Sequence, residues 1–191
     1  MKKFLAMLMA VMMVLSLVTV PVMAESPAAN DPRLSTAPKT GTAAAPADAA
    51  NLNEALNVAG GTLTFTSEGD HPWIVDGDAA KSTNVNVANS TSTVSTTVTA
   101  AAGDILQFDF MSFGEGSGNT VWDGLHLTVD GTEVAKWNRV ETWTTYAVEL
   151  TAGEHTVAWS YQKDGSIDRE GDYATVDNVY CLLYTSDAAD D

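Results

Sequence analysis

The feature that most constrains the fold is a period-two alternation of apolar and polar residues, repeated between residues 63 and 180. Between Leu125 and Val129, for example, apolar residues alternate with His126 and Thr128. Such alternation predicts a β-strand with one buried face and one face in solvent. Comparable segments, alternating or rich in β-branched residues, occupy residues 63–65, 94–98, 106–110, 133–137, 146–150, 157–161 and 173–180.

The intervals between these segments are short and contain turn residues. Asp130-Gly131 predicts a hairpin between two of the strands, and Ala152-Gly153 predicts another turn. The sequence has no amphipathic helix long enough to cover a sheet, which excludes a parallel α/β sheet, because that fold needs crossover helices. The pattern therefore predicts an all-β fold, an antiparallel β-sandwich.

The N-terminal segment has a composition unlike that of the strands. Lys2 and Lys3 precede an apolar run over residues 4–22, and Ala24 completes a site of the kind that signal peptidases cleave. We expect residues 1–24 to be a secretory signal peptide. The alternative is an uncleaved membrane anchor, because the run approaches the ~20 residues that span a bilayer. We favour an exported protein, secreted or at the cell surface, with no membrane insertion after signal removal.

Residues 25–59 are rich in Ala, Pro, Thr and Ser, and such a stretch buries too little apolar surface to offset its ordering entropy. We interpret them as a flexible linker and lead-in. Within this segment, residues 51–58 are compatible with a short helix and with a lead-in strand, and the sequence does not decide between the two. The β-domain is predicted at residues 60–180.

The residues from Cys181 to Asp191 resemble the conceptual translation of a transposon-type sequencing adapter. We therefore expect residues 181–191 to be an artefact and the chain to be a truncated metagenomic fragment of a protein that continues beyond Tyr180. The alternative is a genuine C-terminal strand followed by an acidic tail. Cys181 is the sole cysteine, so the rest of an exported chain relies on core packing or bound ions rather than on disulfides.

The net negative charge of the chain limits the kinds of molecule that it can bind. The chain has 25 Asp and Glu against 9 Lys and Arg, for a formal net charge of -16, and the acidic excess persists when both terminal segments are left out. Such a chain repels phosphate backbones, whose recognition depends on Lys and Arg. Nucleic acid is excluded as a partner, whereas neutral molecules and cations are not.

A family resemblance rests on four segments taken together. They are Phe108-Asp109-Phe110 and residues 129–134, 152–164 and 171–179. In this order and spacing they resemble the MAM-like, concanavalin-type jelly-roll module of bacterial surface proteins, including choice-of-anchor J domains and gingipain-type cleaved adhesins. The resemblance implies a non-catalytic two-sheet jelly-roll, often calcium-stabilised, used for adhesion or glycan contact. Ala174-Thr175-Val176 departs from the pattern, because many members place an aromatic residue there.

Clustered Asp residues beside Gly and Asn are the candidate metal ligands. Calcium prefers six to eight oxygen ligands on loops, which carboxylates and carbonyls supply. Asp109 lies between two inward Phe residues, and the others lie in acidic loops or the last strand. The full candidate set is Asp177, Asp172, Asp109, Asp76 and Asp78. Calcium as the cofactor is implied mainly by the resemblance, and a solvated, mutually repelling acidic surface is the alternative.

Tryptophan residues are the candidate ligand-binding platforms. Trp159 shares a strand face with Val157 and is expected in the core. Trp122 and Trp73 lie next to turns, where indole rings more often stay partly exposed and stack on a sugar face. We select these two as candidate contacts for a glycan or for a host or cell-surface protein.

Catalytic patterns are missing from the sequence. The three His lack the HExxH spacing of metalloproteases, and the two carboxylates that a glycosidase needs on one strand face are not found. Ser117 lies in a Gly-rich segment that lacks the GxSxG pattern and is expected to be a flexible turn. We predict that this fragment is not an enzyme.

These expectations lead to an exported, non-catalytic β-sandwich module for adhesion or carbohydrate binding, cut from a larger bacterial cell-surface protein. Two alternatives remain open. One is a structural spacer or accessory domain of a secreted peptidase or glycosidase whose catalytic domain is missing. The other is a glycosidase in its own right.

Overall fold

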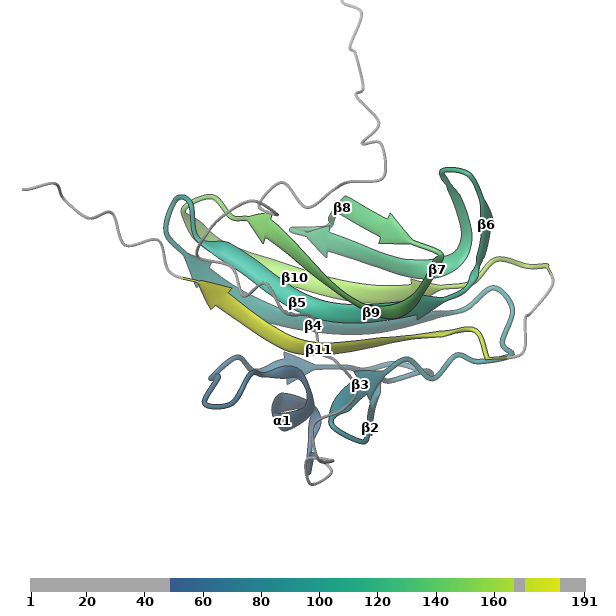
Figure 1. The fold of residues 1–191 in the computed structure, drawn as a ribbon, viewed down its shortest axis with the longest axis horizontal. Coiled ribbons are helices and arrows are strands. Elements are labelled where there is room, and N and C mark those ends of the chain that lie inside the picture. The colour runs from purple at the N-terminus through teal and green to yellow at the C-terminus, as the bar shows by residue number, and fades with distance from the viewer. Residues whose placement is uncertain (1–48, 167–170, 183–191) are drawn as a thin grey trace, which may run out of the picture.

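The computed structural model describes residues 49–166 and 171–182, which form two antiparallel β-sheets stacked face to face (Figure 1). The first, six-stranded sheet has the order β1 (Phe65–Thr66), β4 (Thr91–Ala100), β10 (Gly153–Gln162), β7 (Thr120–Val129) and β6 (Glu115–Ser117), with β8 (Thr132–Trp137) paired to β7. The second, five-stranded sheet has the order β2 (Ile74–Asp76), β3 (Ala79–Lys81), β11 (Tyr173–Leu182), β5 (Ile105–Phe113) and β9 (Arg139–Glu149). The predicted all-β, antiparallel two-sheet jelly-roll β-sandwich is confirmed.

The terminal predictions fall largely outside these residues. The expected signal peptide (residues 1–24), residues 25–48 of the expected linker and residues 183–191 of the adapter-like segment are not among the described residues. Strand β11 does include Cys181 and Leu182, which pair with Leu106 and Ile105 of β5.

The core lies between the two sheets, because alternate residues of each strand point to the same side. The six-stranded sheet contributes Val94, Val98, Leu125, Leu127, Val157, Trp159 and Tyr161, and the five-stranded sheet contributes Leu106, Phe108, Phe110, Tyr146, Val148, Ala174, Val176 and Val179. Trp159 and Phe108 meet across the gap with ring centroids 5.3 Å apart and planes at 85°, an edge-to-face contact. Burial of each such side chain contributes about 1.5–3 kcal/mol to folding.

The predicted Asp130-Gly131 hairpin is present between β7 and β8. Both residues have a positive φ, 52° for Asp130 and 75° for Gly131. Two successive positive φ angles are the mark of the type I′ turn, whose twist matches that of antiparallel strands. The Asp-Gly pair therefore sets the register in which Val129 faces Thr132.

The Gly-rich segment before β7 is not the flexible turn that we expected. Residues 115–117 form strand β6, paired with β7. A Cβ on Gly116 would lie 2.1 Å from Asn138 Nδ2 and 2.2 Å from the carbonyl oxygen of Thr120. Glycine is required here because neighbouring segments of the same chain approach too closely for a side chain, not because the segment needs conformational freedom.

Helix α1 (Leu52–Leu56) settles the segment that the sequence left undecided. Ala55 and Leu56 are fully buried and belong to the main core cluster, so the packed unit begins before Gly60. The helix lies beside β2 and β3 on the β11 side of the sandwich (Figure 1). Its end joins the sheet through a parallel bridge between Asn57 and Val179 of β11. Within the described residues, no helix has the length and apolar character needed to cross a membrane.

Candidate binding site

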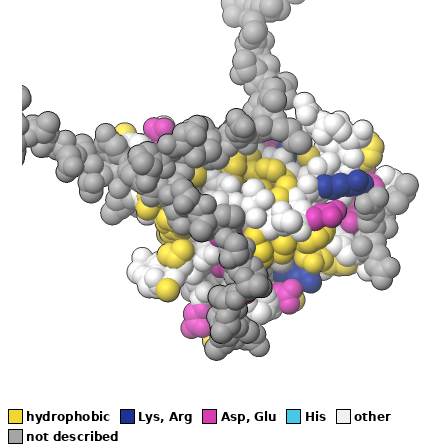
Figure 2. Space-filling view, in the orientation of Figure 1, with side chains coloured by type: hydrophobic (Ala, Val, Ile, Leu, Met, Phe, Trp, Pro, Cys, Tyr) yellow, Lys and Arg dark blue, Asp and Glu magenta, His cyan; other side chains and the backbone are white. Residues whose placement is uncertain are grey.

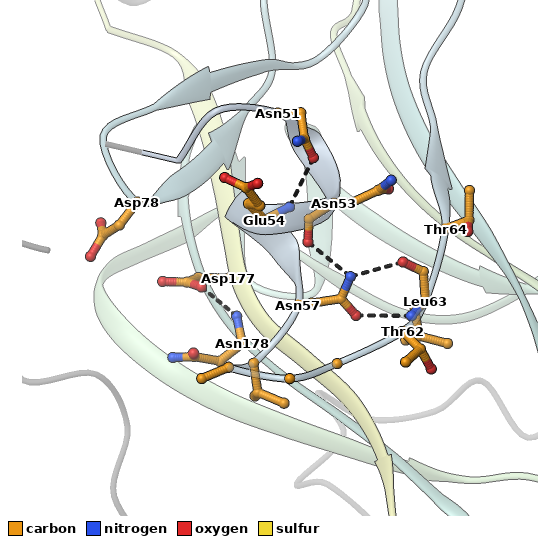
Figure 3. A pocket seen from close by; sticks show the side chains of 14 residues that line it. Asn51, Asn53, Glu54, Asn57, Thr62, Leu63, Thr64, Asp78, Asp177 and Asn178 are labelled. Carbon is orange, nitrogen blue, oxygen red and sulfur yellow. Dashed lines mark hydrogen bonds between the residues drawn. The ribbon is translucent and has the colours of Figure 1, made fainter. Parts of the chain in front are cut away.

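A pocket of about 720 Å³, lined mostly by residues with polar side chains, lies between α1, the loop that follows it and strand β11 (Figure 3). We call it the α1–β11 pocket. Its lining comes from α1 and its flanks (Asn51, Asn53, Glu54, Asn57), from residues 58–64, and from Asp78, Asp177 and Asn178. These residues come from sequence regions far apart, and none of the residues lining the pocket is aromatic, His or Cys.

The helix that forms one wall is stabilised by its own caps. The Asn51 side chain accepts a hydrogen bond from the backbone N–H of Glu54 at 3.1 Å. The Glu54 carboxylate reaches back to accept from the backbone N–H of Ala50 at 2.8 Å. The first bond satisfies a donor that a helix start leaves unpaired. The second ties the residue before the N-cap to the helix, in a variation of the capping box. Five residues are too few for a stable helix in isolation, so caps and core contacts hold it.

Asn57 fixes the loop that forms the opposite wall. Its amide Nδ2 donates to the carbonyl oxygens of Asn53 and Leu63, both at 2.8 Å, and its Oδ1 accepts from the N–H of Leu63 at 3.1 Å. The side chain thus imitates a backbone peptide and pairs with Leu63 as a neighbouring strand would. Gly61 passes directly over it, because a Cβ there would lie 2.7 Å from Asn57 Oδ1.

A bulge in β11 places two consecutive polar side chains at the pocket. The pairing of β11 with β5 shifts between Asp177 and Tyr180, and Asn178 has a φ of 52°. Val176 and Val179 on either side are fully buried. An extra residue between two inward positions lets Asp177 and Asn178 both lie outside the core. The backbone N–H of Asn178 donates to Asp177 Oδ1 at 2.5 Å, which fixes the carboxylate (Figure 3).

Asp109 supports this bulge from the neighbouring strand. Its Oδ2 accepts from Asn178 Nδ2 at 3.0 Å, and its Oδ1 accepts from the Thr145 hydroxyl at 2.6 Å. Asp109 is 4% exposed, although it points away from the core. Its two oxygens are used in orienting Asn178 and Thr145, so Asp109 acts behind the pocket rather than in its lining.

The structure brings together only part of the candidate metal set. Asp177 and Asp78 line the α1–β11 pocket, and Glu54, which the sequence did not single out, lines it with them. Asp76 instead pairs with Lys81 at 3.3 Å, with about half of its side chain exposed. Asp172 is buried elsewhere and lies 3.6 Å from Lys163 Nζ. The five Asp residues therefore do not form one site.

The two candidate tryptophans differ in exposure. Trp122 is 46% exposed on β7, as a sugar platform requires. Trp73 is 2% exposed and belongs to the core cluster, so the expectation that it stacks on a ligand is corrected. Its position beside a turn was misleading, because the chain enters the core directly after Pro72.

An aromatic group that the sequence analysis did not select lies on the outer face of the five-stranded sheet. The rings of Phe113 and Tyr173 are 4.8 Å apart, and Lys81 Nζ lies 4.0 Å from the Tyr173 centroid. Both rings are partly buried and alternate with core residues of β5 and β11. On the face seen in Figure 2, hydrophobic side chains are interspersed with uncharged polar surface and with a few charged side chains.

A second acidic group forms where β6, β7 and the end of β10 meet. The carboxylates of Glu115, Asp123 and Asp164 lie within 4.8 Å of one another. Burial raises the pKa of Asp123 to about 6, and the neighbouring Asp172 also raises it. The hydrogen bond from the Asp164 N–H and the positive charge of Lys163 act in the opposite direction and lower it. The burial of Asp123 could have been predicted from the sequence, because Asp123 lies two residues before Leu125 and so faces the same, inward side of the strand.

No protein-family model matches the chain, and no curated protein matches it. Among solved structures, the secreted serine protease VesC from Vibrio cholerae is similar over 63% of this chain and 25% of its own, with 17% identity and a TM-score of 0.51. The K3 cleaved adhesin domain of Lys-gingipain from Porphyromonas gingivalis matches over 64% and 91%, with 11% identity and a TM-score of 0.45. A family 35 carbohydrate-binding module from Clostridium thermocellum matches over 62% and 92%, with 16% identity and a TM-score of 0.41.

The similarity to VesC shows a shared β-sandwich fold, and this chain spans about a quarter of that protein (25%). A gingipain cleaved adhesin domain and a carbohydrate-binding module are both among the similar structures. The narrower assignment to MAM-like or choice-of-anchor J modules stays a prediction.

Proposed function

We propose that this chain is a non-catalytic module that binds a glycan in the α1–β11 pocket and belongs to a larger protein exported to a bacterial surface. The observation that supports glycan binding is the set of chemical groups that line the pocket. Amide, hydroxyl and carboxylate groups from three segments of the chain line one open cavity (Figure 3). A few convergent polar groups in a concave site are what fix the orientation of a small ligand.

The lining chemistry suits a sugar. Each sugar hydroxyl both donates and accepts hydrogen bonds, so a site needs groups of both kinds. The Asp78 and Asp177 carboxylates accept, whereas an amide such as that of Asn178 donates and accepts. Val58 and Leu63 supply apolar contact for the C–H groups of a ring. The lining therefore offers both polar and apolar groups, as recognition of a pyranose requires.

The pocket walls are held in place before a ligand arrives. Asn57 ties the loop at Leu63 to the helix, and Asp109 holds Asn178 from β5. A ligand then loses less free energy to ordering the protein than it would on a loose loop. Such fixed walls favour selective binding of a particular sugar arrangement.

Calcium is the cation that we propose for the same pocket. Asp177, Asp78 and Glu54 place carboxylates in the lining and Asn178 places an amide there. These three carboxylates are not within 4.8 Å of one another in the described structure, so an ion would have to draw them together. An all-oxygen donor set on a loop-rich wall fits calcium rather than zinc or copper, which favour nitrogen and sulfur. The ion would neutralise part of the acidic lining and offer coordination to sugar hydroxyls. A solvated acidic surface without an ion is the competing interpretation.

The accessory-domain alternative is also retained. In VesC, a secreted serine protease, the similar region is about a quarter of the chain. A β-sandwich of this kind can therefore occur as one part of a larger exported enzyme. Under this alternative the pocket would have no glycan ligand.

The test is a glycan array with purified protein, followed by calorimetry with the best sugar in calcium buffer. Asp177→Asn and Asn178→Gly should each weaken binding about tenfold, equal to about 1.4 kcal/mol. Glycine keeps the positive φ that Asn178 requires. Asp76→Asn, which alters an exposed Asp outside the lining, is the matched control and should bind normally. Folded protein that binds no sugar would support the accessory domain, and release of reducing sugar would indicate a glycosidase.

A further inference from the structure

A buried lysine lies between two buried carboxylates at one end of the sandwich. Lys163 Nζ is 3.6 Å from Asp123 Oδ2 and 3.6 Å from Asp172 Oδ2. The side chains of Lys163 and Asp123 are 0% exposed and that of Asp172 is 3% exposed. Water is thus excluded from all three functional groups.

Strand alternation explains how these charges come together. Lys163 lies two residues after the inward-facing Tyr161, just beyond the end of β10, and so faces the same side. In the same way, Asp172 lies two residues before the inward-facing Ala174, just before the start of β11. Asp123 lies on β7, the neighbour of β10 in the six-stranded sheet. Both sheets therefore contribute a charged group at a position where the pattern calls for an apolar one. Burial of charge is costly, so such positions indicate a specific role.

We propose that Lys163 and Asp123 are joined by an amide bond that forms within the folded domain, with Asp172 carrying the proton. This isopeptide bond links Nζ of Lys163 to Cγ of Asp123. It is a covalent modification of the chain and is separate from the α1–β11 pocket.

The reaction balances without any co-reactant. The Lys163 ammonium gives one proton to the Asp172 carboxylate, and the resulting neutral amine attacks Cγ of the protonated Asp123. The N–C bond forms, and a second proton leaves the nitrogen. The C–O bond to the Asp123 hydroxyl breaks, and that hydroxyl leaves with a proton as water. The products are the amide, one water molecule and protonated Asp172, with no change of oxidation state.

The surroundings of Asp123 favour it as the acceptor. The backbone N–H of Asp164 donates to Asp123 Oδ1 at 2.8 Å, so a hydrogen bond already polarises one oxygen of the carboxyl group while the other faces Lys163. A donor in this position stabilises the negative charge that develops on the oxygen when an amine adds. The raised pKa of Asp123, caused mainly by burial, keeps part of this group in the neutral form that an amine attacks. The three groups are held in reach of one another, which replaces a slow bimolecular step by an intramolecular one.

The bond would tie β7 to the end of β10, two adjacent strands of the same sheet. The one cysteine of the chain, Cys181, lies outside this region, so no disulfide serves there. An amide resists reduction and is retained when the domain unfolds.

Peptide mapping of the purified full chain by mass spectrometry tests the proposal. Trypsin should yield a branched peptide that joins the segment containing Asp123 to the segment containing Lys163, lighter than the two together by the mass of one water. Asp123→Asn should give the same branch with loss of ammonia instead. Lys163→Arg keeps the positive charge but should give only linear peptides. Lys81→Arg, at a partly buried lysine that pairs with Asp76 in the other sheet, is the control and should keep the branch.

Asp172→Asn separates the chemistry from mere proximity. It removes the proton carrier but keeps a polar side chain of the same shape, so the branch should be lost or form at least about tenfold more slowly while circular dichroism shows a folded sheet. Linear peptides alone from folded, unmodified protein would overturn the proposal. A branch that forms equally fast in Asp172→Asn would overturn the role of Asp172. Glycan binding by Lys163→Arg should stay normal, so this test is independent of the proposed function.

Discussion

His155 Nδ1 lies 2.7 Å from the Oδ2 atom of Asp130, and this contact ties the start of β10 to the β7–β8 turn. The same turn is held from the backbone, because Asp130 Oδ1 accepts from the N–H of Thr156 at 2.9 Å. The other ring nitrogen of His155 lies 3.0 Å from the carbonyl oxygen of Thr151. Both ring nitrogens thus face acceptors, an arrangement that favours the doubly protonated imidazolium.

This contact predicts a pH-dependent stability. The hydrogen bond with Asp130 raises the pKa of His155, with help from the Thr151 carbonyl, and the hydrogen bond from His155 lowers the pKa of Asp130. The His155 contribution is fully present below its ordinary pKa of 6.5 and is lost as the pH rises through the higher folded value. The Asp130 contribution is present above its ordinary pKa of 3.8 and is lost as the pH falls through the lower folded value.

The measurement is the thermal midpoint between about pH 5 and 8. The native chain should lose stability as the pH rises through the folded pKa of His155, and His155→Gln should flatten that part of the curve. Asp130→Asn should flatten it less than His155→Gln does, because the Thr151 carbonyl still favours the protonated form of His155. An unchanged decline in both variants would contradict the assignment.

The two candidate tryptophans predict opposite outcomes on truncation. Trp73→Ala leaves a cavity in the core and should lower the free energy of unfolding by about 3–5 kcal/mol. Trp122→Ala removes a half-exposed ring and should change it by no more than about 0.5 kcal/mol. Urea unfolding followed by circular dichroism checks both. Loss of ligand binding in Trp122→Ala at unchanged stability would make Trp122 a second contact, outside the α1–β11 pocket.

The contact between Asn57 and Gly61 predicts coupled effects. Asn57→Ala removes three hydrogen bonds and should cost about 1–3 kcal/mol of stability. Gly61→Ala places a Cβ against Asn57 Oδ1 and should destabilise the native chain. In the Asn57→Ala background the same change should cost less, with a coupling energy of about 0.5–3 kcal/mol. Strict additivity in the four-member set of unfolding curves would show that the clash is relieved in another way.

Calcium should stabilise the domain if it binds in the α1–β11 pocket. The thermal midpoint should rise with added calcium and fall with a chelator, because a ligand that binds only the folded state raises its stability. Asp177→Asn should remove this response, and Asp76→Asn should keep it. Equal midpoints for the native chain in calcium and in chelator would exclude the ion.

The strands were predictable because a half-buried strand leaves a local, period-two record, as at Leu125 and Leu127. Other features depend on contacts between segments far apart in the sequence. Gly116 lies in a strand that pairs with β7, and Asn138 packs against it too closely for a side chain, a contact that the sequence around Gly116 does not reveal. Helix α1 is too short to show a clear period and is defined by its caps and by buried Leu56.

The candidate site was only partly predictable. Asp177 and Asp78 were singled out as acidic residues beside Asn or Gly, and they do share a pocket. Glu54 was missed because it lies in a segment that the sequence analysis assigned to the lead-in. The burial of Asp123 and Lys163 could also have been predicted, since both lie at alternate positions from inward-facing residues of their strands.

The bridge between Asn57 and Val179 has a consequence for the order of folding. It joins the beginning of the described fold to its last strand, so the α1 wall of the pocket docks only after nearly all of the domain has been synthesised. Contacts between such distant segments form late, because the chain must first close a long loop. A chain still being synthesised would have many of its strands but no completed pocket. The binding site would be acquired in the final step of folding.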